Sequence, residues 1–176
     1  MFNRTSVEDA LYSVLQPVVG CEVIFVRPNA PRPTSRDYVT IGIGEVRQKG
    51  REEIASPNGQ GVASMWAHYS VSVEFTGFGP SSKDTITALQ FALGKDSVID
   101  DLWLLDIAVV SHDDSLLDIP VFRDTIWEES SRFNATFHVR VTDSDTVGFI
   151  EQVTVDGELS GGVVNDPIET SVTIAP

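Results

Sequence analysis

The clearest pattern along the chain is an alternation of apolar and polar residues that passes directly into a helical repeat. Between residues 69 and 75 every second side chain is apolar, which is typical of a strand with one buried face. That face holds Tyr69, Val71, Val73 and Phe75. After a Gly-Pro turn at 76–80, the segment 81–93 places Ile86, Leu89, Ala92 and Leu93 at helical spacings. The sequence therefore predicts a strand, a turn and a helix that lies on a sheet.

A second amphipathic helix is predicted at the N-terminus. Thr5 and Glu8 have the spacing of a capping box, in which each side chain accepts a hydrogen bond from the backbone N–H of the other residue. Pro17 and Gly20 are expected to end the helix. The apolar stripe between cap and end consists of Val7, Ala10, Leu11, Val14 and Leu15.

Short apolar or alternating runs predict the other strands. These runs lie at residues 22–27, 38–44, 107–110, 132–142 and 149–155, with a turn at 156–157. Gly42 and Gly44 indicate a close approach of another backbone, or a bulge. Residues 96–105 fit a short helix and a buried turn equally well. Residues 168–174 are expected to form an added edge strand or an arm that pairs with a neighbouring subunit.

Two long loops are predicted between these strands. Residues 28–37 contain three prolines, which remove donors from a strand ladder, so we expect an irregular loop. Residues 50–63 have little apolar content and are rich in turn-forming residues. We expect them to form a long flexible hairpin loop, of a kind that commonly becomes ordered against a partner.

Together these elements predict an α+β fold, in which a mostly antiparallel or mixed β-sheet packs against an N-terminal helix and a central helix. A chain of 176 residues can bury enough surface to fold without a disulfide or a metal. We expect a single domain over residues 1–157, followed by a C-terminal extension or edge strand over 158–176.

The acidic composition limits the classes of partner. The formal net charge is −14, which repels polyphosphate and argues against sequence-specific nucleic-acid binding. No apolar run reaches the roughly 20 residues of a membrane span, and the N-terminus lacks a signal-peptide pattern. We therefore expect a soluble protein made in a cytoplasm. The lone Cys21 lies beside an apolar strand and is expected to be a small buried thiol.

The turn at residues 77–85 has the position of a phosphate loop, between a strand and a helix. It lacks the glycine spacing of both common phosphate-binding motifs, and Pro80 removes a backbone donor. We expect a tight turn with a helix cap at Ser81 or Ser82.

No catalytic, cofactor-binding or metal-binding motif stands out elsewhere. His68, His112 and His138 do not have the spacing of metal ligands. Asp113 and Asp114 are adjacent carboxylates, which leave a small metal-dependent or ligand-binding domain as an alternative.

The order of these signals resembles a known family over roughly residues 7–155. The resemblance is carried by Val26-Arg27, Arg32-Pro33, Asp37-Tyr38-Val39-Thr40-Ile41, Gly77-Phe78-Gly79 and Trp127-Glu128-Glu129 leading to Arg132. In this order they are similar to the neck or tail terminator proteins of tailed bacteriophages. These are small α+β subunits that form a ring, usually a hexamer, between the head connector and the tail tube.

The resemblance implies a non-enzymatic virion protein, made in the host cytoplasm, at the neck or the head-proximal end of the tail. Its implied partners are further copies of itself, a head-tail connector or adaptor protein on one side, and a tail tube or sheath protein on the other. DNA would pass through the lumen without specific binding, which the acidic charge favours. Another morphogenetic subunit, such as a head-tail adaptor or a baseplate component, is the alternative within this class.

Candidate interface residues are the basic and turn residues near the two predicted loops, because arginine can pair with carboxylates of a partner. They are Arg27, Arg32, Arg36, Arg51, Asn58 and Gly59. Arg132 is instead expected to form a local ion pair with Glu128 or Glu129.

Overall fold

The computed structural model describes residues 2–27, 33, 35–123, 125–146, 152–158 and 167–173. The chain divides into two compact units. Unit 1 comprises Met1–Glu52 and Ala67–Val141, and unit 2 comprises Glu53–Trp66 and Thr142–Pro176. The domain boundary that the sequence predicts after residue 157 stays a prediction.

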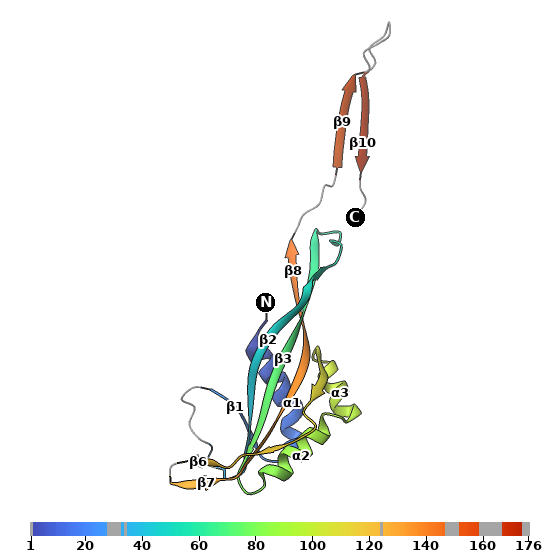
Figure 1. Ribbon diagram of the computed structural model, residues 1–176. Helices are drawn as coiled ribbons and strands as arrows, with labels where there is room; N and C mark the ends of the chain where they lie inside the picture. The colour runs from blue at the N-terminus through green and yellow to red at the C-terminus, as the bar shows by residue number, and fades with distance from the viewer. Residues whose placement is uncertain are drawn as a thin grey trace. The chain divides into compact units, whose positions relative to one another are not determined.

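In the part of the chain that the structure describes, six strands form one mixed sheet (Figure 1). They are β1 (Glu22–Phe25), β2 (Tyr38–Ile54), β3 (Val62–Phe78), β4 (Ile107–His112), β5 (Leu117–Asp118) and β8 (Ser130–Thr146). The order is β1-β2-β3-β8-β4, and β5 also pairs with β8. β1 runs parallel to β2, whereas β4 and β5 run antiparallel to β8. The α+β prediction is therefore confirmed.

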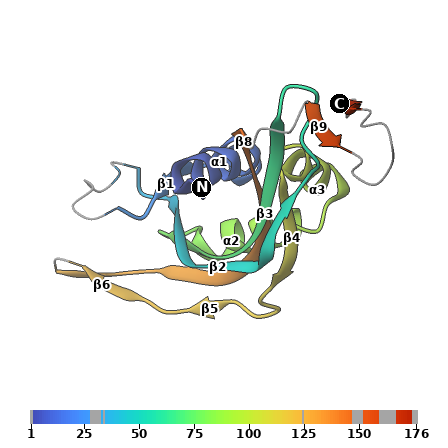
Figure 2. The same cartoon turned by 90° about the horizontal axis from the view of Figure 1, so that it is seen from above.

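Three helices of unit 1 lie on one face of this sheet (Figure 2). They are α1 (Arg4–Val19), α2 (Ser82–Ala92) and α3 (Asp96–Trp103). The sequence left a helix and a buried turn open at residues 96–105, and α3 shows that a helix forms there. The predicted alternation is confirmed, since Val71, Val73 and Phe75 are fully buried. Phe75 also packs on Phe133 of β8, with ring centroids 5.1 Å apart. The helices bury the predicted stripe residues Leu11, Leu15, Ile86 and Leu89 against the same core.

The N-terminal helix is confirmed, but the prediction of its cap is wrong. The cap is Asn3, whose side-chain oxygen accepts hydrogen bonds from the backbone N–H groups of Thr5 and Ser6. Glu8 is buried and its carboxylate pairs with arginines instead of closing a capping box. Pro17 lies inside the last turn, and the helix ends at Gly20 in a left-handed conformation with φ of 70°.

The loop predicted at residues 50–63 is confirmed at its centre and wrong at both ends, which together make up half of its length. β2 continues to Ile54 and β3 begins at Val62, so only residues 55–61 connect them. Ala55 N–H donates to the carbonyl of Ser64 at 2.9 Å, which continues the ladder to the turn. The first six residues of β2 are buried or half-buried and the last eleven are exposed. An exposed strand has no apolar face, and this explains why the alternation failed to reveal it.

The turn between β3 and α2 is a structural corner, as predicted, but neither serine caps the helix through its side chain. Ser81 occupies the N-cap position without a side-chain cap, and its N–H donates to Asp37 Oδ1 at 3.0 Å. Gly79 has φ of +97°, and a Cβ there would lie 2.5 Å from the same Asp37 oxygen. At Gly42 and Gly44 a Cβ would meet its nearest neighbours at 3.4 and 3.5 Å, so the close approach lies at the turn instead.

Two further pairs of strands form small antiparallel sheets. In unit 1, β6 (Val121–Arg123) pairs with β7 (Ile126–Glu128). In unit 2, β9 (Gln152–Glu158) pairs with β10 (Pro167–Thr173). The turn predicted at 156–157 is wrong, because both residues lie within β9. The start of the strand predicted at 149 lies outside the described residues. No helix in the described part of the chain is both long and apolar enough to span a bilayer.

Candidate interaction surface

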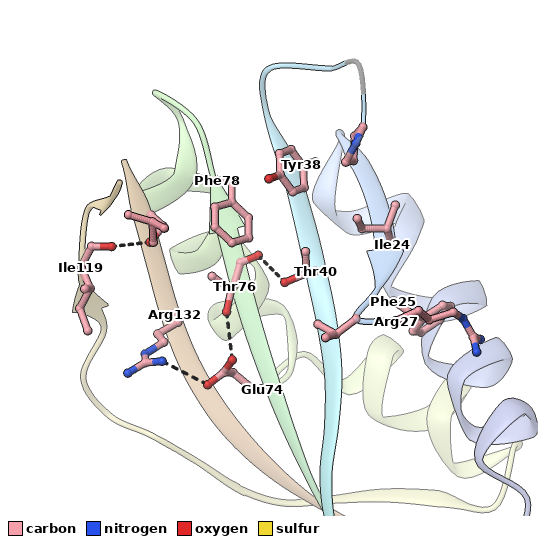
Figure 3. Close-up of a pocket in the computed structure, with 14 residues that line it drawn as sticks. Ile24, Phe25, Arg27, Tyr38, Thr40, Glu74, Thr76, Phe78, Ile119 and Arg132 are labelled. Atoms are coloured by element: carbon pink, nitrogen blue, oxygen red, sulfur yellow. Dashed lines mark hydrogen bonds and ion pairs between the residues drawn. The ribbon is translucent and has the colours of Figure 1, made fainter. Parts of the chain in front are cut away.

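A groove of about 430 Å³ lies on the face of the sheet that points away from the helices (Figure 3). Side chains alternate along a strand, so the residues of β3 next to the buried Val73 and Phe75 face this side. The walls are mainly apolar and come from β1, β2, β3 and from the segment leading into β6. They include Ile24, Val26, Tyr38, Phe78, Ile119 and Val121.

One ion pair crosses the floor of the groove. Arg132 Nη1 lies 3.5 Å from Glu74 Oε2, and the Thr76 hydroxyl donates to Glu74 Oε1 at 3.4 Å. The expectation of a local partner for Arg132 is therefore wrong, because β3 and β8 are neighbours and bring distant residues together. Both side chains are exposed by more than 40 %, so the pair adds little stability by itself.

Arg27 lies at one end of the groove and is partly engaged within the subunit. Its Nη2 is 2.6 Å from Glu8 Oε2, and Arg4 Nε is 2.9 Å from Glu8 Oε1. The Glu8 side chain is 1 % exposed, whereas that of Arg27 is 54 % exposed. Arg27 therefore neutralises a buried carboxylate and still presents positive charge at the surface.

The proline-rich loop is described only in part. Arg32 lies outside the described residues, and Arg36 is exposed. The carbonyl of Arg36 and the carboxylate of Asp37 pack against Gly79, so the end of this loop is fixed to the turn before α2. The Ser81 N–H group that an anion would use already donates to Asp37.

Arg51 belongs to β2, and it extends a row of basic side chains that the sequence analysis missed. Arg47, Lys49 and Arg51 occupy every second position of the exposed half of the strand, and Gly50, with a φ of +75°, lies between the last two. Arg47 Nη2 is 2.6 Å from Glu45 Oε1, but both side chains are about two thirds exposed. The sequence carries this signal as an alternation of charged residues, which apolar periodicity does not reveal.

Asn58 and Gly59 form the tip between β2 and β3 in unit 2. The Asn58 side-chain oxygen accepts from the N–H groups of Gln60 and Val62 at 2.9 and 3.1 Å. Its amide therefore holds the turn in shape. Gly59 is exposed at the same tip. Thus the structure gives Asn58 a local role, and a contact to a partner stays a prediction for both.

The groups that might have carried chemistry make structural contacts. Asp113 Oδ2 accepts from the backbone N–H and the side-chain amide of Asn134, both at 3.0 Å. Among the described residues, no group of three or more His, Cys, Asp or Glu side chains could hold a metal ion. Desolvation by burial, followed by the negative charges of Asp37 and Glu22, raises the pKa of the half-buried Cys21 thiol and keeps it protonated.

Of the comparisons with known proteins, the one with protein families assigns the chain. In the solved structures, the chain is similar to the sheath/tube terminator, in its extended state, of the extracellular contractile injection system PVC. The identity is 14 % and the TM-score 0.44, with coverage of 93 % of this chain and 66 % of that one. The chain thus spans just under two thirds of that protein.

The comparison with curated protein sequences found no match. The family model described as "phage neck terminator protein" matches residues 5–162. This match covers the long strands β2, β3 and β8, with α2, α3 and all but the first residue of α1, so the chain belongs to the phage neck terminator protein family.

Proposed function

We propose that this chain is a non-enzymatic virion protein that terminates the tail tube of a tailed phage and completes the neck as a ring-shaped homo-oligomer. The family match over residues 5–162 carries this proposal. In this role the ring, a hexamer on our reading, joins a head-tail connector or adaptor protein on one side to a tail tube or sheath protein on the other.

The charge of the chain supports a role in which DNA passes without being held. With a net charge of −14, a ring of several copies has a strongly negative field. A lumen that neutralised phosphates would retain DNA, since each such contact adds affinity. A predominantly acidic ring avoids this retention during ejection.

The groove and the exposed half of β2 are the surfaces that we assign to neighbouring proteins. The groove offers apolar walls, with Arg27 and Arg132 at its polar positions. Arg47, Lys49 and Arg51 offer a charged row that suits an acidic partner. Arg32, Arg36, Asn58 and Gly59 remain candidate contacts of the loop and the tip.

Imaging of purified particles that carry a tagged chain tests the proposal. We expect the tag at the junction of head and tail, and a ring of density at that position. A tag at the distal end of the tail would favour a baseplate component, and absence of the protein from particles would overturn the proposal. A phage mutant that lacks this protein should produce heads and tails that fail to join.

A further inference from the structure

The segment that leads from β4 into β6 forms one wall of the groove. We call residues 113–121 the strap. Its last part contributes Ile119 and Val121 to the lining of the groove, and Figure 3 shows Ile119 on the side opposite Ile24. The position of the strap therefore determines how wide the groove is on this side.

The strap has little apolar contact with the core of unit 1. Among residues 113–120 only Leu116 is half-buried, and it packs against the hydrophobic core. The others are exposed, and Leu117 and Ile119 are so by 47 and 44 %. Segments with few buried apolar contacts open at a lower free energy than the rest of a fold. Polar contacts are therefore needed to keep the strap in place.

One set of polar contacts fixes the start of the strap. The backbone N–H of Asp113 donates to the carbonyl of Asn134 at 2.8 Å, and Asn134 donates twice to the Asp113 carboxylate at 3.0 Å. Gln90 of α2 donates to the Asp113 carbonyl at 2.5 Å. These contacts continue the pairing of β4 with β8, but they do not fix the part of the strap that reaches the groove.

A second set of contacts lies directly before the groove wall and centres on Asp118. The Ser131 hydroxyl donates to Asp118 Oδ1, and Lys83 Nζ of α2 lies 3.1 Å from Asp118 Oδ2. The next residue, Ile119, donates its N–H to the carbonyl of Ser130 at 3.0 Å, and the Ser130 hydroxyl donates to the carbonyl of Ile119 at 2.5 Å. Asp118 thus joins the strap to both β8 and α2.

We propose that Asp118 is a positioning residue for the groove, and that its contacts hold the strap in the form that a neighbouring protein binds. The inference rests on the proposed function, which assigns the groove to such a protein. The described residues that line the groove include Ile119 and Val121 but not Asp118, so Asp118 acts through the wall. A wall that is fixed before binding loses less conformational entropy on association than a wall that must first be ordered.

The hydrogen bond from Ser131 contributes more to this effect than the ion pair with Lys83. The side chains of Lys83 and Asp118 are 68 and 49 % exposed, and exposed ion pairs stabilise little. Ser131 is 2 % exposed, so its hydroxyl would lose its acceptor inside the protein if Asp118 were removed. A buried donor without a partner is costly. Asp118→Ala should therefore loosen the strap more than Lys83→Gln does.

Hydrogen exchange of the Ile119 amide, measured by NMR, tests the effect on the strap. In Asp118→Ala this amide should exchange about three- to tenfold faster, as expected for the loss of one hydrogen bond, while the amides of β3 keep their rates. Lys83→Gln should change the rate by less than about twofold. The matched control is Arg140→Gln, which removes a similarly exposed ion pair with Asp106 and should leave the rate unchanged. An unchanged rate in Asp118→Ala would overturn the inference.

A disulfide in place of the Asp118–Ser131 contact tests whether the held strap is the form that binds. The two residues are direct partners in the register of β5 and β8. Such partners have Cα atoms about 4.5–5.5 Å apart, which suits a disulfide. The variant Asp118→Cys with Ser131→Cys is made in a Cys21→Ala background, which removes the other thiol.

Joining of heads to tails, in extracts that lack the protein, is compared with and without reductant. The reduced double variant should join at least about threefold less than the Cys21→Ala parent, and the oxidised form should join as well as the parent. The parent with and without reductant is the control. Poor joining by the oxidised form alone would show that the strap must open, and would overturn the inference. Equal joining by both forms would overturn it as well.

Failure of this inference is distinguishable from failure of the proposed function. If the wild-type protein does not join heads to tails, the proposed function fails. If wild type joins and Asp118→Ala joins equally well although its Ile119 amide exchanges faster, the position of the wall does not matter. The inference then fails and the proposed function stands.

Discussion

The two halves of β2 belong to one strand but have opposite surroundings, and only the first half also pairs with β1. Residues 38–43 are buried or half-buried under the helices, whereas residues 44–54 are exposed throughout. The first half contributes Val39, Ile41 and Ile43 to the core, and the second half presents Arg47 and Lys49 to solvent. One strand therefore holds the subunit together at one end and offers a charged surface at the other. Substitutions in the two halves should therefore affect different properties.

The largest effect is expected in the buried half of the sheet. Phe133→Ala should lower the free energy of unfolding by about 3–5 kcal/mol, since Phe133 is fully buried and stacks on Phe75. Chemical denaturation measures the change. The control is His138→Ala on the exposed face of the same strand, with an expected change within about 0.5 kcal/mol. Equal effects of both variants would remove the distinction between the two faces.

The second-largest effect on the free energy of unfolding is expected at Glu8, whose carboxylate is buried. Glu8→Gln should destabilise the fold by about 1–3 kcal/mol, because a buried group that held two arginines loses its charge-assisted bonds. Arg27→Gln should cost less, about 1 kcal/mol or below, since its side chain is half exposed and Arg4 remains to pair with Glu8. Thermal unfolding of both variants checks the order. A larger loss for Arg27→Gln would show that its role is mainly structural.

The sequence predicts the buried half well because burial leaves a periodic trace. The alternation at Val71, Val73 and Phe75 and the helical spacing of Ile86 and Leu89 both identified the core face correctly. The exposed half of β2 leaves no such trace, and the composition around Asn58 pointed to a long loop. Where both faces of a strand meet water, apolar periodicity cannot separate strand from loop.

The contacts of the candidate surface could not be predicted for a different reason. Arg132 meets Glu74 from 58 positions away, and Ser81 meets Asp37 from 44 positions away. Such pairs depend on strand order, which the sequence pattern does not determine. The wrong cap at Thr5 shows a local limit, because Asn3 fits the cap equally well and Glu8 is needed by Arg27. Exposure of Trp103 and Trp127 likewise follows from packing and not from residue type.

A smaller, pH-dependent effect is expected where β5 joins the sheet. The hydrogen bond from the Ser131 hydroxyl, and after it the contact with Lys83, lower the pKa of Asp118 below its ordinary value. Because its pKa is lower in the folded state, the Asp118 carboxylate stabilises the fold at pH values above its unfolded-state pKa. This contribution is lost as the pH falls through its folded-state pKa. Asp118→Asn should therefore be less stable than wild type at pH 6 and equal to it near pH 2. Denaturation at both values measures this; a difference that persists at low pH would contradict the assignment.

The smallest effect on stability, and a clear effect on assembly, is expected in the exposed half of β2. Replacement of Arg47, Lys49 and Arg51 by glutamine removes exposed charges, so the unfolding free energy should change by less than about 0.5 kcal/mol. If this row binds an acidic neighbour, the variant should join heads to tails poorly when added to extracts that lack the protein.

Joining by wild type should weaken with added salt, because screening acts on exposed charges. The control replaces Gln48 and Glu52, whose side chains hydrogen-bond to each other in the same exposed half of β2. Equal joining by the triple variant and wild type at low salt would show that the charged half of β2 faces no partner.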